Sequence, residues 1–175
     1  VLSLLALGLV SLTAHAVTVD ARSSVYLAGQ SSNPVNTGLG ILPQEIAVSG
    51  NSQYQFTNVS GTVDFDGGGS IASNGADGVA APQASSSPDV PGLSAPTVSN
   101  GGSFPQIRYL AGVFTDGTLP AAPTPAKLLQ SIGAAGFSPA LGQIFFIGDG
   151  LTGTGSGIAQ LFLAPSGAAK LFLGF

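Results

Sequence analysis

Short apolar segments, separated by turns rich in Gly and Pro, constrain the fold of this chain more than any other feature. The clearest three are residues 144–147, 158–163 and 169–175, which follow one another at intervals of about a dozen residues. No stretch beyond the N-terminus keeps a helical period. At 175 residues the chain has the size of one domain. The sequence therefore predicts a single all-β domain, either a sandwich or a barrel.

Further elements are expected earlier in the chain. Residues 18–28, 45–48 and 107–114 are rich in β-branched, aromatic and aliphatic side chains and are predicted as strands. Residues 126–132 are expected to form one or two helical turns after a Pro-rich break. The segment 79–103 contains four prolines and many Ser and Ala residues, so we expect a long surface loop there.

One segment combines clear alternation with a change of face. Tyr54 and Phe56 share one parity, whereas Val59 and Val63 have the opposite one. Because side chains alternate with a period of two along a strand, the switch predicts a bulge or tight bend near residues 57–58.

The N-terminus has the pattern of a secretory signal peptide. Residues 1–10 form an apolar run too short to span a bilayer, and Ala14, His15 and Ala16 fit a cleavage site. We expect cleavage after Ala16, a mature domain over residues 17–175 with no membrane span, and an extracellular location. The positively charged start of a signal peptide is missing, and Phe175 ends the chain within a strand. Both observations predict a fragment of a longer protein.

Composition excludes several classes of function. The net charge is −4 with only four Lys and Arg residues, so a basic groove for nucleic acid is not expected. The absence of Cys excludes disulfides and thiol nucleophiles. The single His lies at position 15, inside the predicted signal peptide, so the mature chain holds no Ser-His-Asp triad.

A glycine-rich motif follows the segment 144–147. Residues 148–153 fit the G-x-G-x-x-G pattern of dinucleotide-binding loops, which requires a helix next. The following residues 154–157 are poor helix formers, and Asp149 would repel phosphate. The sequence therefore favours a hairpin loop over a cofactor site.

The most acidic segment offers candidate metal ligands. Asp64, Asp66 and Asp77, with Asn74 between them, supply oxygen ligands of the kind that Ca²⁺ prefers. The spacing does not match an EF-hand loop. The alternative interpretation is ordinary turn chemistry, because Asp-Gly and Asn-Gly favour hairpins.

The remaining carboxylates are scattered along the sequence. A glycosidase needs two of them facing each other across a sugar. The sequence leaves such a pair open among Asp20, Glu45, Asp89, Asp116 and Asp149. Glu45 is the only Glu, however, and it opens a predicted strand, where solvent exposure is the simpler explanation. Three tyrosines are able to stack on sugar rings, although packing in the core is the more common role for such residues. They are Tyr26, Tyr54 and Tyr109.

Several segments together resemble a group of secreted bacterial exoproteins of the PEP-CTERM type. The segments are residues 17–30, 61–63, 110–116, 142–157 and 169–175. The β-sandwich of that group is similar to the calcium-dependent galactophilic lectins and to galactose-binding jelly rolls. The resemblance implies an antiparallel jelly-roll sandwich, truncated at its C-terminus. In the lectins the ligand loop follows the strand that 169–175 resembles, so no lectin ligand is assigned to a residue here.

Three functions follow in order of preference. The first is a non-catalytic module that binds extracellular polysaccharide or another glycan at a bacterial cell surface or matrix. The second is a structural exoprotein without a small ligand, which the low charge and positive mean hydropathy favour. The third is a hydrolase that acts on glycosides.

Overall fold

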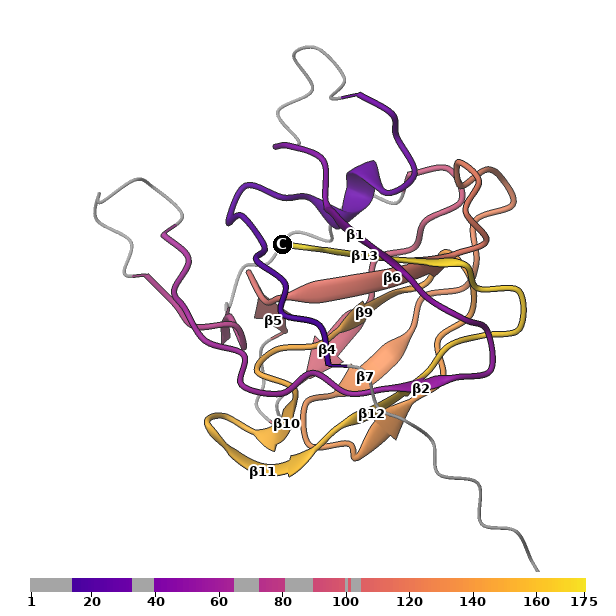
Figure 1. Cartoon of the computed structure of the whole chain (residues 1–175). Coiled ribbons are helices and arrows are strands. Elements are labelled where there is room, and N and C mark those ends of the chain that lie inside the picture. Colours follow the sequence, from indigo (N-terminus) through magenta and orange to yellow (C-terminus); the bar gives the residue numbers. More distant parts are fainter. Residues whose placement is uncertain (1–13, 33–39, 65–72, 81–89, 100, 102–104) are drawn as a thin grey trace, which may run out of the picture.

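The computed structural model describes residues 14–32, 40–64, 73–80, 90–99, 101 and 105–175. The described chain is all-β, as predicted, and its one helical element is the short 3₁₀ turn η1 (Val25–Leu27). Its strands form several small sheets, and no closed barrel is present among the described residues (Figure 1).

A four-stranded antiparallel sheet forms the centre of the molecule. Its strand order is β1 (Gln44–Ala47), β13 (Lys170–Gly174), β6 (Ala111–Thr115) and β9 (Ile144–Phe146). Strands β1, β9 and β13 confirm three of the predicted segments. β6 is the central buried strand, with every residue excluded from solvent.

Strands β13, β6 and β9 of the central sheet are buried on both faces, whereas the edge strand β1 is mostly exposed. Leu171 lies opposite Phe114, and the next residue, Phe172, lies opposite Val113. Alternation along the strands then divides the buried side chains between two apolar clusters. The first cluster includes Phe114, Phe145, Leu171 and Leu173, whereas the second includes Val113, Ile144 and Phe172. Burying each of these large side chains contributes about 1.5–3 kcal/mol, so this sheet carries much of the stability.

A three-stranded sheet covers the first cluster. It consists of β2 (Gln53–Tyr54), β12 (Leu161–Leu163) and β8 (Gly136–Phe137), with β12 antiparallel to β2 and parallel to β8. Phe162 is fully buried, and its ring centroid lies 5.3 Å from that of Phe145. The second cluster is covered instead by η1 and by Leu93.

Three two-stranded pairs complete the described fold. β3 (Val79–Ala80) pairs with β5 (Gln106–Ile107), and β10 (Leu151–Gly153) forms a hairpin with β11 (Ser156–Ala159). β4 (Thr97–Ser99) runs parallel to β7 (Leu129–Ser131).

The prediction of a strand over residues 18–28 is wrong, because these residues form turns. The N–H groups of Ser23, Leu27 and Ala28 donate to carbonyls three residues earlier, so they form local turns. These turns use the N–H groups that a strand ladder would need. Val25, Leu27 and Ala28 are nevertheless buried, as the side chains of a core strand would be. Their apolar character therefore reflects burial and not strand formation.

Two predicted strands are interrupted. The segment 107–114 is split between β5 and β6, because Arg108 has a left-handed backbone with φ of 57°. The segment 158–163 is split between β11 and β12 at Gln160, whose side-chain amide donates to the carbonyls of Ile132 and Ala134. The bend predicted near residues 57–58 is confirmed, since Asn58 also has a φ of 57°.

The expected helical turns at residues 126–132 are also wrong, because this segment contains β7. Gln130 is buried there, and its side-chain oxygen accepts a hydrogen bond from the N–H of Phe146. The expected surface loop at 79–103 is wrong in its second half. Ser94, Ala95 and Val98 are buried, and β4 supplies the partner of β7.

The predicted signal peptide lies mostly outside the described residues, and Ala14 to Ala16 are exposed. Within the described part of the chain, no helix is long and apolar enough to cross a membrane.

Candidate functional site

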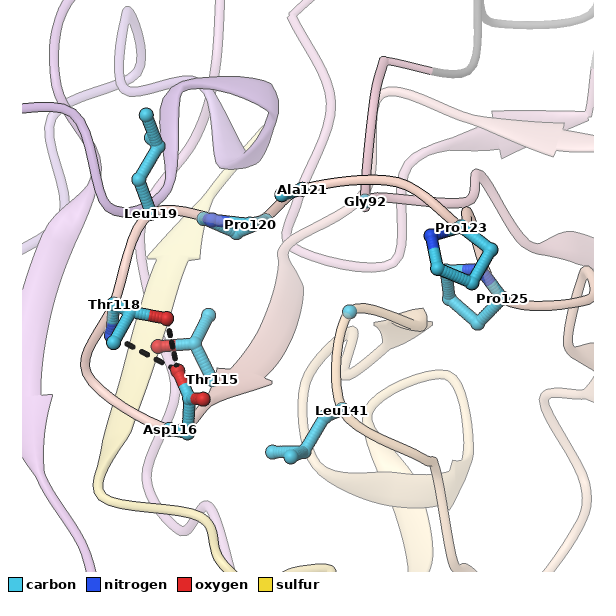
Figure 2. A pocket seen from close by; sticks show the side chains of 11 residues that line it. Gly92, Thr115, Asp116, Thr118, Leu119, Pro120, Ala121, Pro123, Pro125 and Leu141 are labelled. Atoms are coloured by element: carbon cyan, nitrogen blue, oxygen red, sulfur yellow. Dashed lines mark hydrogen bonds between the residues drawn. The ribbon is translucent and has the colours of Figure 1, made fainter.

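A cavity of about 340 Å³ lies beside the loop that follows β6, and we call it the Asp116 pocket. The loop supplies most of its wall, and two distant segments close it. The lining residues are Gly92, Thr115, Asp116, Thr118, Leu119, Pro120, Ala121, Pro123, Pro125, Leu141 and Gly142. Figure 2 shows the polar side chains on one side of the pocket and Pro123 and Pro125 on the opposite side.

Asp116 is the charged group of this pocket. Its Oδ1 accepts two hydrogen bonds from Thr118, one from the hydroxyl at 2.6 Å and one from the backbone N–H at 2.9 Å. These bonds, the hydroxyl first, lower the pKa of Asp116 below its ordinary value. The carboxylate is therefore ionised at neutral pH and held in one orientation.

The loop that carries Asp116 is anchored at both ends. Thr115 is buried at the end of β6, and its hydroxyl accepts the N–H of Gly117. Further along, the hydroxyl of Thr124 accepts the N–H of Gly92 at 3.1 Å. Gly92 has a φ of 78° and packs against the backbone of Ala121, so a side chain there would collide with the loop. These contacts fix the polar and apolar walls relative to each other.

A second cavity, also of about 340 Å³, lies at the hairpin β10–β11, and we call it the Asp149 pocket. Its lining residues are Thr57, Asn58, Val59, Asp149, Leu151 and Gly155. Asp149 Oδ1 accepts the N–H of Leu151 at 2.9 Å, and Oδ2 accepts the N–H of Gly155 at 2.6 Å.

The three predicted calcium ligands are not brought together in the described structure. Asp66 lies outside the described residues, and Asp64 is exposed next to Val63, which pairs with Asn74. Asp77 Oδ1 accepts the N–H of Asp149 at 2.8 Å, so this oxygen supports a turn. Among the described residues, no three His, Cys, Asp or Glu side chains lie close enough to share a metal ion. The calcium site therefore stays a prediction.

The glycine-rich motif leads into a hairpin, as expected, and not into a helix. β10 begins within the motif at Leu151 and pairs with β11. The pyrophosphate of a dinucleotide would have no helix N-terminus to bind here. This excludes the Rossmann-type arrangement for this loop.

Two of the scattered carboxylates form ion pairs on the surface. Asp20 binds Arg22 at 2.9 Å, which lowers the pKa of Asp20 to about 2. Glu45 binds Lys170 at 2.8 Å across the β1–β13 pair. Neither lines the Asp116 or the Asp149 pocket, and Asp89 lies outside the described residues.

The three tyrosines belong to the packed interior. Tyr54 packs near Phe114, and its hydroxyl accepts the N–H of Ser49 at 2.7 Å. Tyr109 packs edge-on against Phe146, and burial raises its pKa. Tyr26 lies against the second cluster. Since none of them lines either pocket, they do not provide a stacking platform there.

Sequence reasoning missed the Asp116 pocket because its wall is assembled from three distant segments. Asp116 and Thr118 are close in sequence, but Gly92 and Leu141 are brought to them by β6, β9 and their connections. An Asp followed two residues later by Thr, directly after a buried strand, is the local signal that was available. It predicts a turn and does not predict a cavity.

No protein-family profile, no curated protein and no solved structure matches this chain.

Proposed function

We propose that this chain is a secreted, non-catalytic β-sandwich module of the galactose-binding-like type, which binds carbohydrate through the Asp116 pocket. The packing of the sheet β2–β12–β8 across the first apolar cluster of the central sheet supports a two-layered sandwich. The predicted signal peptide supports a role at a bacterial cell surface or in an extracellular matrix, with a polysaccharide or glycan as partner.

The observation that carries the proposal is the two-sided chemistry of the pocket. A sugar ring has hydroxyl groups around its edge and apolar C–H groups on its faces. Asp116 and Thr118 offer a charged acceptor and a hydroxyl on one side, and Pro123 and Pro125 offer apolar surface on the other (Figure 2). A pocket with apolar walls and a few fixed polar groups is the usual form of a small-molecule site.

The state of the carboxylate favours neutral, hydroxylated ligands. Asp116 is ionised, and its Oδ2 remains able to accept hydrogen bonds from hydroxyl groups. An anionic ligand would be repelled by this charge. Hydrogen bonds to a charged acceptor are about twice as strong as neutral ones, which suits recognition of a sugar hydroxyl.

The same pocket argues against hydrolysis. Glycosidases use two carboxyl groups on either side of the bond that is cleaved. Asp116 is the one carboxylate among the residues that line the Asp116 pocket. The pocket therefore suits binding and not catalysis. The lining offers a single carboxylate, and calcium sites gain affinity with the number of charged ligands, so we propose that binding here is independent of calcium.

A glycan array tests the proposal. The chain from residue 17 is applied to the array with calcium and with a chelator, beside the variant Asp116→Asn. We expect signal under both conditions and a weaker signal for the variant. Absence of signal under both conditions would remove the carbohydrate-binding function.

A second candidate function is a structural exoprotein that packs with copies of itself or with matrix polymers. The specific observation is a group of exposed aliphatic side chains, among them Leu129 at 78% and Ile158 at 64% exposure. Sedimentation velocity over a range of protein concentrations tests it. Association that weakens in a Leu129→Ser, Ile158→Ser variant supports this role, and a monomer at all concentrations contradicts it.

A further inference from the structure

The Asp116 and Asp149 pockets lie at opposite ends of one pair of strands. β6 and β9 are antiparallel neighbours at the centre of the molecule, with Val113 opposite Ile144. Asp116 directly follows the C-terminal residue of β6, and Asp149 follows β9 after two residues. Because antiparallel strands end at opposite edges of a sheet, the two aspartates stand at opposite ends of this pair.

Both aspartates are fixed by the same local bond. In each case Oδ1 accepts the backbone N–H two residues later, from Thr118 after Asp116 and from Leu151 after Asp149, both at 2.9 Å. Asp149 is fixed further by Gly155 at the tip of the hairpin. Each pocket therefore holds a carboxylate whose position is set before any ligand arrives.

The Asp149 pocket adds neutral polar groups and apolar surface. Thr57 and Asn58 are exposed and form its rim, while Val59 and Leu151 are half-buried. A carboxylate accepts hydrogen bonds, a hydroxyl does both, and an amide offers two donors and one acceptor. This set matches adjacent hydroxyl groups of a sugar, and the apolar residues match its C–H groups.

Each pocket is large enough for a small molecule. Each pocket measures about 340 Å³, which lies within the range of about 300–1,000 Å³ for small-molecule sites. The left-handed backbone of Asn58, with φ of 57°, turns the chain sharply at the rim. The pocket is thus formed by the fold of two loops and not by a single turn.

We infer that the Asp149 pocket is a second binding site for neutral sugars, so that one chain bridges two glycan segments. This inference rests on the proposed function of the Asp116 pocket and extends it. A protein with two such sites at opposite ends of a sheet binds a polysaccharide more tightly than either site alone, through effective concentration.

An NMR titration of the ¹⁵N-labelled full chain tests the inference. Galactose, glucose and mannose are added separately, and amide shifts are followed around residues 57–59 and 149–151 and around residues 115–119. The variant Asn58→Gly removes the amide at a position where Gly keeps the backbone conformation. Asn51→Gly is the matched control, because Asn51 also has a positive φ of 61° but does not line the pocket.

We expect saturable shifts in both regions with one of the sugars. Asn58→Gly should weaken the apparent affinity reported by the shifts at residues 57–59 and 149–151 at least fivefold, and it should leave the shifts at residues 115–119 unchanged. The control Asn51→Gly should leave the shifts in both regions unchanged. Shifts confined to residues 115–119 would overturn the second site and leave the proposed function intact. Shifts confined to residues 57–59 and 149–151 would keep this site and overturn the Asp116 pocket, and no shifts anywhere would overturn both.

Discussion

Asp77 Oδ1 accepts the backbone N–H of Asp149 at 2.8 Å, across 72 positions of the sequence. The bond joins the turn before β3 to the turn before β10, and the side chain of Gln106 donates to the carbonyl of Asp77 at 2.7 Å. One carboxylate thus connects the segment predicted to bind calcium with the wall of the Asp149 pocket.

Removal of this acceptor should destabilise the fold. We expect Asp77→Ala to lower the free energy of unfolding by about 1–3 kcal/mol, because the part-buried N–H of Asp149 loses its acceptor. Asp77→Asn keeps an oxygen at the same position and serves as the control. Urea unfolding measures the free energy of unfolding of both variants. An equal loss of stability in Asp77→Asn and Asp77→Ala would show that the charge of Asp77, and not this hydrogen bond, stabilises the fold.

Gly112 in β6 is expected to tolerate no side chain. A Cβ there would lie 2.8 Å from Cζ of Phe145 and 2.9 Å from Cδ1 of Ile147, both fully buried. Gly112→Ala should therefore cost about 1–3 kcal/mol through overpacking of the first cluster.

Gly75 supplies the matched control for this substitution. It has no positive φ, and a Cβ built on it would meet no atom within 4 Å. The melting temperatures of Gly112→Ala and Gly75→Ala are compared by thermal unfolding, and we expect that of Gly112→Ala to be lower. Equal melting temperatures would contradict the packing described around Phe145.

The pKa of Asp116 should depend on Thr118. The hydroxyl is the first cause of its lowering, so Thr118→Val should raise this pKa toward the ordinary value of 3.8. The pKa of Asp116 is lower in the folded state than in the unfolded state. The contact therefore stabilises the protein fully at pH values above the unfolded-state pKa. This stabilisation is lost as the pH falls through the folded pKa. NMR titration of the Asp116 carboxyl carbon measures the shift, and identical curves for both proteins would contradict the contact.

Calcium should stabilise the chain if the predicted site at Asp64, Asp66 and Asp77 is correct. Extracellular calcium modules have dissociation constants of about 0.1–1 mM, so about 10 mM calcium should add roughly 1.4–2.7 kcal/mol and raise the melting temperature by several degrees. Asp66→Asn should remove the effect. A melting temperature that does not respond to calcium would show that these residues serve turn chemistry alone.

Sequence alone predicted the parts of the fold that are specified locally. β9 and β13 are short apolar segments bounded by turns, and β1 lies in a segment where Ile46 and Val48 share one face. The parity change at Asn58 marked a real bend. In β13 the consecutive apolar residues 171–173 fit a strand that is buried on both faces.

The errors have two causes, a distant strand partner in one segment and local turns in the other. Residues 128–132 have no strong preference, and β7 forms because β4, from the expected surface loop, supplies hydrogen-bond partners. Residues 25–28 are as apolar as a strand, but the N–H groups of Leu27 and Ala28 donate to the carbonyls of Ser24 and Val25 in the 3₁₀ turn η1. Both outcomes depend on contacts that periodicity does not encode.

The candidate site was predictable only in part. Asp149 and the hairpin after it followed from the glycine-rich motif, but Thr57 and Asn58, which complete the Asp149 pocket, lie about 90 positions away. In the same way, the apolar wall opposite Asp116 depends on how residues 120–125 fold back against Gly92. Such pockets belong to the assembled fold and not to a sequence pattern.

The most direct test of sugar binding at the Asp116 pocket is the affinity of the array-selected glycan for the wild type and for Asp116→Asn, measured by isothermal titration. The variant keeps the Oδ1 acceptor for Thr118, but it loses the charge and places an amide NH₂, which donates a hydrogen bond, where Oδ2 accepted one. A charged hydrogen bond exceeds a neutral one by about 1–1.5 kcal/mol, so we predict binding about five- to tenfold weaker. Equal affinities for the two proteins would contradict the assignment of the glycan to this pocket.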